Sequence, residues 1–148
     1  MLYLSSMLPA AAILLSALYL FLSILHLYWA SGGRWGWGAA IPSDDRQKQV
    51  LHPTPFHCVL VATVLLLFAL SALVRGGFWD WAGGNLFVSV LLWMQVTVFL
   101  LRAVGDFRYV GFFKKVNKTA FARNDSLIYS PLCLLLAALA LCLALQAL

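Results

Sequence analysis

The sequence predicts an all-α integral membrane protein: a four-helix bundle with a short amphipathic interfacial helix between spans three and four. Three observations carry this prediction. Of the 148 residues, 64% are hydrophobic and only 10% are charged, whereas an ordinary soluble domain carries about 25% charged residues. Four long stretches contain no charged residue, and the basic residues gather in the connections between them. We therefore expect a single transmembrane domain over residues 1–148.

Each of the four uncharged stretches is long enough for one crossing. These stretches are 1–33, 49–74, 81–101 and 126–148. A helix needs about 20 apolar residues to cross a hydrocarbon core about 30 Å thick. We expect the spans near residues 7–29, 56–74, 86–104 and 127–148. The first stretch has no basic residues before it and is longer than the apolar core of a signal peptide, so we expect it to be retained.

The basic residues also predict the orientation of the chain. The first connection holds Arg34, Arg46 and Lys48, the third holds six more basic residues, and the second holds Arg75 alone. Because cytoplasmic connections are enriched in lysine and arginine, we expect the first and third connections in the cytoplasm and both termini outside it. The short, glycine-bounded connection 75–84 should make the second and third spans antiparallel neighbours.

Two spans carry faces with a distinct composition. In the first span, Ser16, Tyr19, Ser23 and His26 recur at helical spacing, so this polar face should point into the bundle. Its side chains can form hydrogen bonds between helices, or they can line a polar cleft. In the fourth span a row of small residues predicts a close packing seam. This row consists of Ser126, Ser130, Cys133, Ala137, Ala140 and Ala144.

The cytoplasmic end of the third span places an arginine and an aspartate one helical turn apart. Arg102 and Asp106 are expected to form an ion pair that anchors the helix, on the same face as Gln95. The segment that follows, drawn as a helix, separates Tyr109 and other apolar residues from a basic side. We expect this helix to lie on the lipid surface, or alternatively to cover a cleft. The basic side contains Arg108, Lys114, Lys115 and Lys118.

The sequence offers no established metal or redox motif. The three cysteines form no Cys-x-x-Cys pair and no zinc-type cluster. His26 and His57 are expected at a similar depth, which makes a bis-histidine haem or metal site conceivable, but histidines at matching depth arise easily at interfaces. His52 is separated from His57 by two prolines. We expect no metal and no cofactor.

Several sequence segments resemble a known bacterial family. The stretch 102–115 reads RAVGDFRYVGFFKK and is followed by FARND at 121–125 and YSPLC at 129–133; upstream lie HLYWA at 26–30 and GRWG at 33–36. These motifs resemble the domain of unknown function 3995 family, and the likeness covers nearly the whole chain. The resemblance implies a small four-span protein without an established activity, and we expect a bacterial inner (plasma) membrane location.

The residues favour a non-enzymatic binder of a lipid-like ligand, or an accessory subunit. A membrane-embedded enzyme acting on a lipid-like substrate at the cytoplasmic face is the alternative, and a small transporter is the second alternative. The candidate catalytic groups are His26, Asp106, Tyr109 and Tyr129. The candidate ligand-binding residues are Arg102, Arg108, Arg123, Asp125, Ser23, Trp29 and Arg34. Lys114, Lys115 and Lys118 are expected to contact the lipid surface.

The expected partners follow from this setting. We expect membrane lipids as partners. A lipid or isoprenoid ligand and a partner protein or second copy of the chain are further candidates. We do not expect nucleic acid as a partner, because basic connections beside apolar spans indicate topology and headgroup contact. A proton-coupled antiporter would place an acidic residue near the bilayer midplane, and none of the five aspartates lies deep in a predicted span.

Overall fold

The computed structural model describes residues 2–46, 48–79 and 85–146, and helices dominate it. Three long helices are α1 (Leu2–Ala30), α3 (Pro55–Arg75) and α4 (Asn85–Val104). The fourth is continuous through α5 (Ala120–Asn124), the π-helix η1 (Asp125–Tyr129) and α6 (Ser130–Leu145), and a single turn, α2 (Trp37–Ala40), follows α1. The segments long and apolar enough to cross a membrane are Leu8–Ala30, Pro55–Arg75, Leu86–Val104 and Ala120–Leu145. This confirms the predicted four-span architecture.

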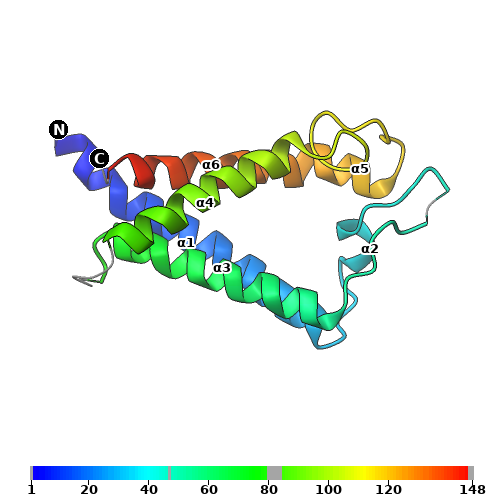
Figure 1. Ribbon diagram of the computed structural model, residues 1–148, viewed down its shortest axis with the longest axis horizontal. Helices are drawn as coiled ribbons and strands as arrows, with labels where there is room; N and C mark the ends of the chain where they lie inside the picture. Colours follow the sequence, from blue (N-terminus) through cyan, green and yellow to red (C-terminus); the bar gives the residue numbers. More distant parts are fainter. Residues whose placement is uncertain (1, 47, 80–84, 147–148) are drawn as a thin grey trace.

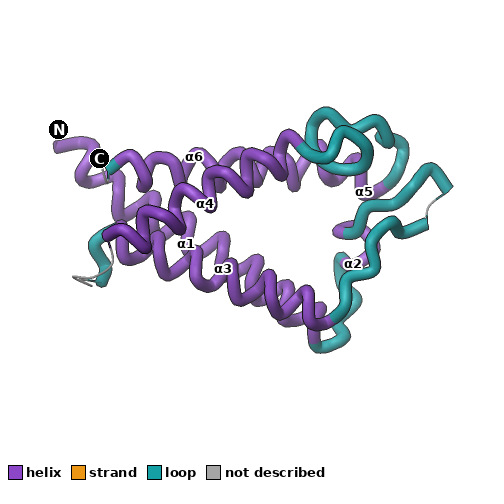
Figure 2. The backbone as a smooth tube through the Cα atoms, in the orientation of Figure 1, coloured by secondary structure: helices purple, strands orange, loops and turns teal. Residues whose placement is uncertain are grey.

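The four long helices form two pairs that meet at one end of the molecule. Helix α1 packs along α3, and α4 packs along α6. The pairs converge where the two termini and the end of α3 lie, and they diverge toward the opposite end, where α2 and α5 lie (Figure 1). Loops at this open end connect α1 to α3 and α4 to α5 (Figure 2). Helices α3 and α4 are in contact, as expected, although each has a more extensive partner elsewhere.

The inner face of α1 confirms the predicted polar stripe. Ser16 and Ser23 are buried, and their hydroxyls donate to the carbonyls of Ala69 and Ala62 on α3 at 2.9 and 2.8 Å. Between them the fully buried ring of Tyr19 lies 5.5 Å from that of Phe99. The two serines therefore form hydrogen bonds between helices, as polar side chains in lipid commonly do.

The small-residue face of the fourth helix is also confirmed as a packing seam. Five of its six members are buried, and Ser126 at its start is exposed. The outward faces are apolar: Leu127 is 70% exposed and Phe21 is 60% exposed. Such contiguous exposed apolar surface is unfavourable in water and suits a helix bundle surrounded by lipid. The buried members are Ser130, Cys133, Ala137, Ala140 and Ala144.

The predicted amphipathic helix after the third span is wrong. Residues 105–119 form an irregular loop, and the last helix begins at Ala120 instead of at residue 127. Helix α4 ends because Gly105 adopts a φ of 86°, outside the helical region. The loop then folds back so tightly that the backbone of Gly111, also at positive φ, lies against the Val104 carbonyl. Two glycines at positive φ thus turn the chain into a compact loop here instead of a surface helix.

Candidate functional site

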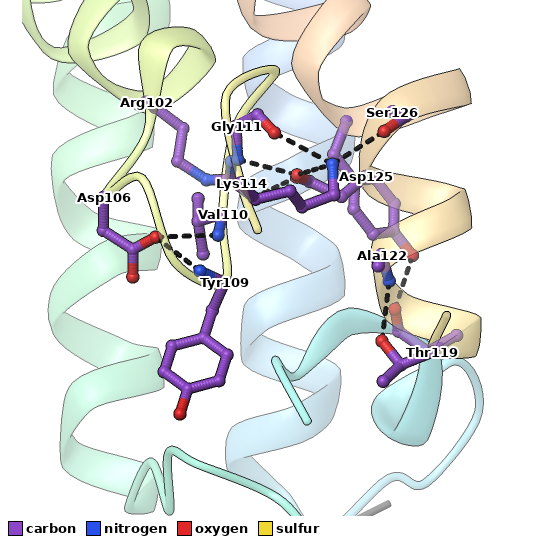
Figure 3. Close-up of polar contacts among 12 residues, drawn as sticks. Arg102, Asp106, Tyr109, Val110, Gly111, Lys114, Thr119, Ala122, Asp125 and Ser126 are labelled. Carbon is purple, nitrogen blue, oxygen red and sulfur yellow. Dashed lines mark hydrogen bonds and ion pairs between the residues drawn. The ribbon is translucent and has the colours of Figure 1, made fainter. Parts of the chain in front are cut away.

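The loop at the open end is held by a buried carboxylate, Asp125. One oxygen of Asp125 accepts from the Arg102 guanidinium at 2.9 Å. The other accepts from the Gly111 backbone N–H at 2.7 Å and from the Lys114 ammonium at 3.0 Å. Figure 3 shows these groups converging from α4, the loop and the start of the fourth helix. Asp125 is fully buried, so these three donors replace the water it would otherwise bind.

The local helix geometry places Asp125 in this position. Asp125 opens the π-helical turn, in which the Ser130 N–H donates to the Asp125 carbonyl. A π-turn is wider than an α-turn, so residues five apart share a face. Asp125 and Ser130 are accordingly both 0% exposed. The π-turn therefore directs the Asp125 carboxylate toward α4. Asp125 lies on the same buried face of the fourth helix as the small residues that follow it.

The expected ion pair between Arg102 and Asp106 is wrong, because Arg102 pairs with Asp125. Gly105 ends α4 between the two residues and turns the chain away. Asp106 instead accepts from the backbone N–H groups of Arg108, Tyr109 and Val110 at 2.9, 2.7 and 2.9 Å. Burial by itself would raise the pKa of Asp106, but these N–H groups outweigh it and hold the pKa below its ordinary value. Asp106 thus stabilises the loop by accepting hydrogen bonds from three of its backbone N–H groups.

Lys114 also corrects an expectation, since it does not face the lipid surface. Its side chain is 2% exposed, and its ammonium donates to Asp125, to the Gly111 carbonyl at 2.8 Å and to the Ser126 hydroxyl at 2.7 Å. All three ammonium protons are therefore used within the protein. Arg102 and Lys114 together outnumber the single carboxylate, so the cluster carries one net positive charge. We interpret it as a structural clamp on the loop.

A separate pocket lies between the end of α1, α2 and the start of α3. It has a volume of about 360 Å³ and is mainly apolar. Two of the predicted site residues, His26 and Trp29, contribute to its wall, and Arg102 does not. The full lining is His26, Trp29, Trp37, Ala40, Ile41, Pro42, Leu51, His52, Pro53, His57, Cys58 and Val61. The candidate residues His26 and Arg102 therefore do not share this pocket, whereas His26 and His57 do.

The backbone fixes one ring nitrogen of each of these two histidines. The Nδ1 of His26 lies 2.7 Å from the Leu22 carbonyl oxygen, one turn earlier in α1. The Nδ1 of His57 accepts from the Thr54 backbone N–H at 3.3 Å and lies 2.7 Å from the Thr54 hydroxyl, within a capping box in which Thr54 in turn caps α3. In both side chains, hydrogen bonds within the chain therefore use Nδ1, the nitrogen nearer the backbone.

Aromatic rings form another wall of the pocket. The Trp29 ring packs edge-on against His26 at 5.1 Å and against Trp37 at 5.7 Å. The Trp29 indole N–H donates to the Trp35 carbonyl at 2.9 Å, so it is not available to a ligand. Among the residues that the structure describes, the pocket lining contains no lysine, arginine, aspartate or glutamate. Its polar side chains are therefore the three histidines and one buried thiol, Cys58.

The remaining candidate residues are scattered over the open end. Tyr129 donates its hydroxyl to the Ala39 carbonyl at 3.1 Å and so connects the fourth helix to α2. Tyr109 is half-buried, and its ring lies 5.1 Å from the Arg108 guanidinium. The other candidate cations are exposed and do not line the histidine pocket. These cations are Arg34, Arg108, Arg123, Lys115 and Lys118. Ser23 forms a hydrogen bond between α1 and α3, as described above.

In the ranges 2–46, 48–79 and 85–146, no three histidine, cysteine or acidic side chains are placed so that they could hold a metal ion. The pocket residues that sequence reasoning left out of the candidate list include Trp37, His52 and His57. The available signal was Thr54-Pro-Phe-His57, which has the spacing of a capping box and fixes His57 at the start of α3.

The fold and these two sites define a small, multi-pass membrane protein with four apolar helices. Within that class, the family model described as protein of unknown function (DUF3995) matches residues 19–140. The chain belongs to this family. The match extends from the polar face of α1 through the pocket and the Asp125 cluster to the α6 seam. No curated protein and no solved structure matches the chain.

Proposed function

We propose that this protein is a non-enzymatic binder of a lipid-like ligand, which it holds in the pocket between α1, α2 and α3. The observation that carries the proposal is a pocket of about 360 Å³ with an apolar wall and a few polar groups. Binding sites for small molecules have this composition and volumes of roughly 300–1,000 Å³. Trp29 and Trp37 supply ring surface for an apolar ligand, and His26 and His57 supply the polar contacts.

The position of the pocket along the helices also supports a lipid-like ligand. His57 and Thr54 lie at the start of α3, whereas Val61 lies one turn deeper into the span. A ligand with a polar head near the histidines can therefore direct an apolar tail along α3 into the hydrocarbon. Tryptophan is typical of this depth, because its ring favours the membrane interface.

We further propose that the pocket faces the cytoplasm of a bacterial cell and that both termini lie outside the cytoplasm. Nine of the ten basic residues lie in the connections at the open end or in the helical turns beside them, and Arg75 ends α3 at the other end (Figure 1). The positive-inside rule assigns the basic end to the cytoplasm. Reporter fusions at residue 148 test this: activity of an externally active reporter supports the orientation, and activity of a cytoplasmic reporter overturns it.

Filling the pocket tests the binding proposal. In the variant Val61→Trp, a large ring replaces a side chain of the pocket wall, whereas Val64→Trp places the same ring on an exposed part of α3 that does not line the pocket. Each protein is extracted in native membrane particles and its bound lipids are identified by mass spectrometry. We expect one lipid species enriched with the wild type and with Val64→Trp and lost with Val61→Trp. Equal lipid content in all three would contradict the proposal.

A further inference from the structure

We infer that α2 is a wall of the pocket that the fourth helix holds in place, so that the spacing of the two helix pairs controls lipid binding. The inference rests on the proposed function and names how that same site is regulated. It follows from the position of α2, which lies at the open end between the α1–α3 pair and α5 (Figure 2). Tyr129 is the residue that connects the spacing to the pocket.

Helix α2 contributes directly to the pocket. Trp37 and Ala40 line it, together with Ile41 and Pro42, which follow the helix. The Trp37 ring also lies 5.7 Å from the ring of Trp29, which lines the pocket from α1. The other lining residues belong to α1, to α3 and to the segment before α3. A shift of α2 relative to α1 and α3 therefore changes the size of the pocket.

Helix α2 is also attached to the fourth helix. Among the helices that the structure describes, α2 makes its most extensive contact with α5. The Tyr129 hydroxyl donates to the Ala39 carbonyl at 3.1 Å, and neither residue lines the pocket. Tyr129 therefore acts on the pocket through α2, as a positioning residue. One wall of a pocket built on the α1–α3 pair is thus held by the α4–α6 pair.

The connection from α1 to α2 is suited to absorb a movement. Gly32 has a φ of 94°, and Gly36, which precedes α2, has a φ of 73°. Hinges are a few loop residues that take up backbone changes, and glycine adopts positive φ without a steric cost. The two helix pairs meet at the far end and diverge toward α2 (Figure 1). A change in the angle between them therefore moves α5 most at the open end, and α2 follows α5.

Coupling between the pocket and the spacing acts in both directions. A spacing that brings α2 against the pocket favours the bound lipid, and the bound lipid favours that spacing, because thermodynamic coupling between two events is reciprocal. The Tyr129 hydrogen bond stabilises this arrangement. Its loss should weaken lipid binding by about fivefold, which corresponds to about 1 kcal/mol for one hydrogen bond.

Lipid retention tests the role of Tyr129. Each variant is extracted in native membrane particles, and the native lipids that remain bound after a series of detergent washes are quantified per protein by mass spectrometry. We expect Tyr129→Phe to retain about fivefold less of the enriched lipid than the wild type. Tyr109→Phe, which leaves the contact with Ala39 intact, should retain as much as the wild type.

The pocket-filling variant separates failure of this inference from failure of the proposed function. If Tyr129→Phe retains the lipid fully, or if Tyr109→Phe loses as much of it, the inference is overturned, whereas loss in Val61→Trp still supports the pocket. If Val61→Trp also retains the lipid fully, the proposed function fails and the inference fails with it.

The spacing itself is measurable between spin labels on the two helix pairs. Leu60 on α3 and Leu127 on the fourth helix are 51% and 70% exposed, so Leu60→Cys and Leu127→Cys provide labelling sites. The labelled protein also carries Cys142→Ala, because Cys142 is exposed and the other two cysteines are buried. Pulsed electron paramagnetic resonance in the same membrane particles gives the distribution of distances across the open end.

Two variants should change this distribution. In Tyr129→Phe the attachment of α2 to the fourth helix is weakened, and in Val61→Trp the added ring replaces the lipid beside α2. Tyr109→Phe and Val64→Trp should keep the wild-type distribution. An unchanged distribution in either of the first two variants would overturn the coupling, even if lipid retention falls, because Tyr129 would then stabilise the fold without connecting the spacing to the pocket.

Discussion

Arg102 and Asp125, 23 residues apart in the sequence, form a 2.9 Å ion pair that joins α4 to the start of the fourth helix. The carboxylate is fully buried, and the guanidinium side chain is 32% exposed. Because Lys114 and the Gly111 N–H share the same carboxylate, one residue holds a helix end, a loop and a second helix together. One buried negative charge therefore joins α4, the loop that follows it and the fourth helix.

Removing this charge should destabilise the protein strongly. The variant Asp125→Asn leaves Arg102 and the 2% exposed Lys114 without a counter-charge. Losing one member of a buried ion pair lowers the free energy of unfolding by about 3–5 kcal/mol. Because Arg102 is partly exposed, we expect a loss of about 3 kcal/mol. Unfolding by sodium dodecyl sulfate in mixed micelles measures the loss. Asp45→Asn, which removes the same charge from an exposed position, should change stability by less than about 0.5 kcal/mol.

Asp106 should make the loop sensitive to acid. Its pKa is lower in the folded protein than in the unfolded chain. Its stabilising contribution is therefore complete above the ordinary aspartate pKa of about 3.9 and is lost as the pH falls through the lower folded-state value. Hydrogen exchange of the Arg108, Tyr109 and Val110 amides should show protection that decreases over this acidic window. In Asp106→Asn this pH dependence should be absent; an unchanged profile would rule out Asp106 as its source.

The two loop glycines should not tolerate alanine. Gly105 and Gly111 have φ values of 86° and 87°, and an added Cβ would collide with the Val110 and Val104 carbonyls. Gly105→Ala and Gly111→Ala should each cost about 2 kcal/mol or more, because strain and a backbone clash combine. The matched control is Gly38→Ala, where a Cβ meets no atom within 4 Å. Thermal unfolding in detergent should show a lowered midpoint for the two loop variants only.

The Tyr129 hydroxyl should help to hold α2 in place. Tyr129→Phe removes its 3.1 Å hydrogen bond to the Ala39 carbonyl, at an expected cost of about 1 kcal/mol. Because Ala40 and Ile41 line the pocket, the amides around α2 should exchange faster in this variant. Tyr109→Phe provides the comparison, since the Tyr109 hydroxyl has no hydrogen-bond partner among the described residues. Equal exchange in both variants would show that the Tyr129 contact does not restrain α2.

Helical periodicity was sufficient to predict which face of a span is buried. Ser16, Tyr19 and Ser23 lie inside because a helix repeats every 3.6 residues and its polar groups need partners in lipid. The same periodicity misled the prediction after α4. Residues 105–119 separate apolar and basic side chains onto two sides when they are placed on a helix. However, two glycines at positive φ and the hydrogen bonds to Asp106 favour a compact loop. Local spacing could not reveal that the loop packs around the buried carboxylate of Asp125, which lies in the next helix.

The candidate site was predictable only in part for the same reason. The sequence indicated His26, Trp29, Arg102 and Asp125 as functional candidates, but it paired Arg102 with its neighbour Asp106. Four-residue spacing is a reliable guide only while the helix continues, and Gly105 ends it. His57 was recognised at the right depth, yet its place in one pocket with His26 depends on how α1 packs against α3.

The sequence by itself determined the number of apolar spans and their lengths, because these depend on residue hydrophobicity summed over about 20 residues. Only the tertiary structure decided the partner of Arg102, the burial of Lys114 and the union of two histidines in one pocket. Those outcomes depend on contacts between residues far apart in the chain. Their energy is gained only once the helices have packed, so no local pattern contains it.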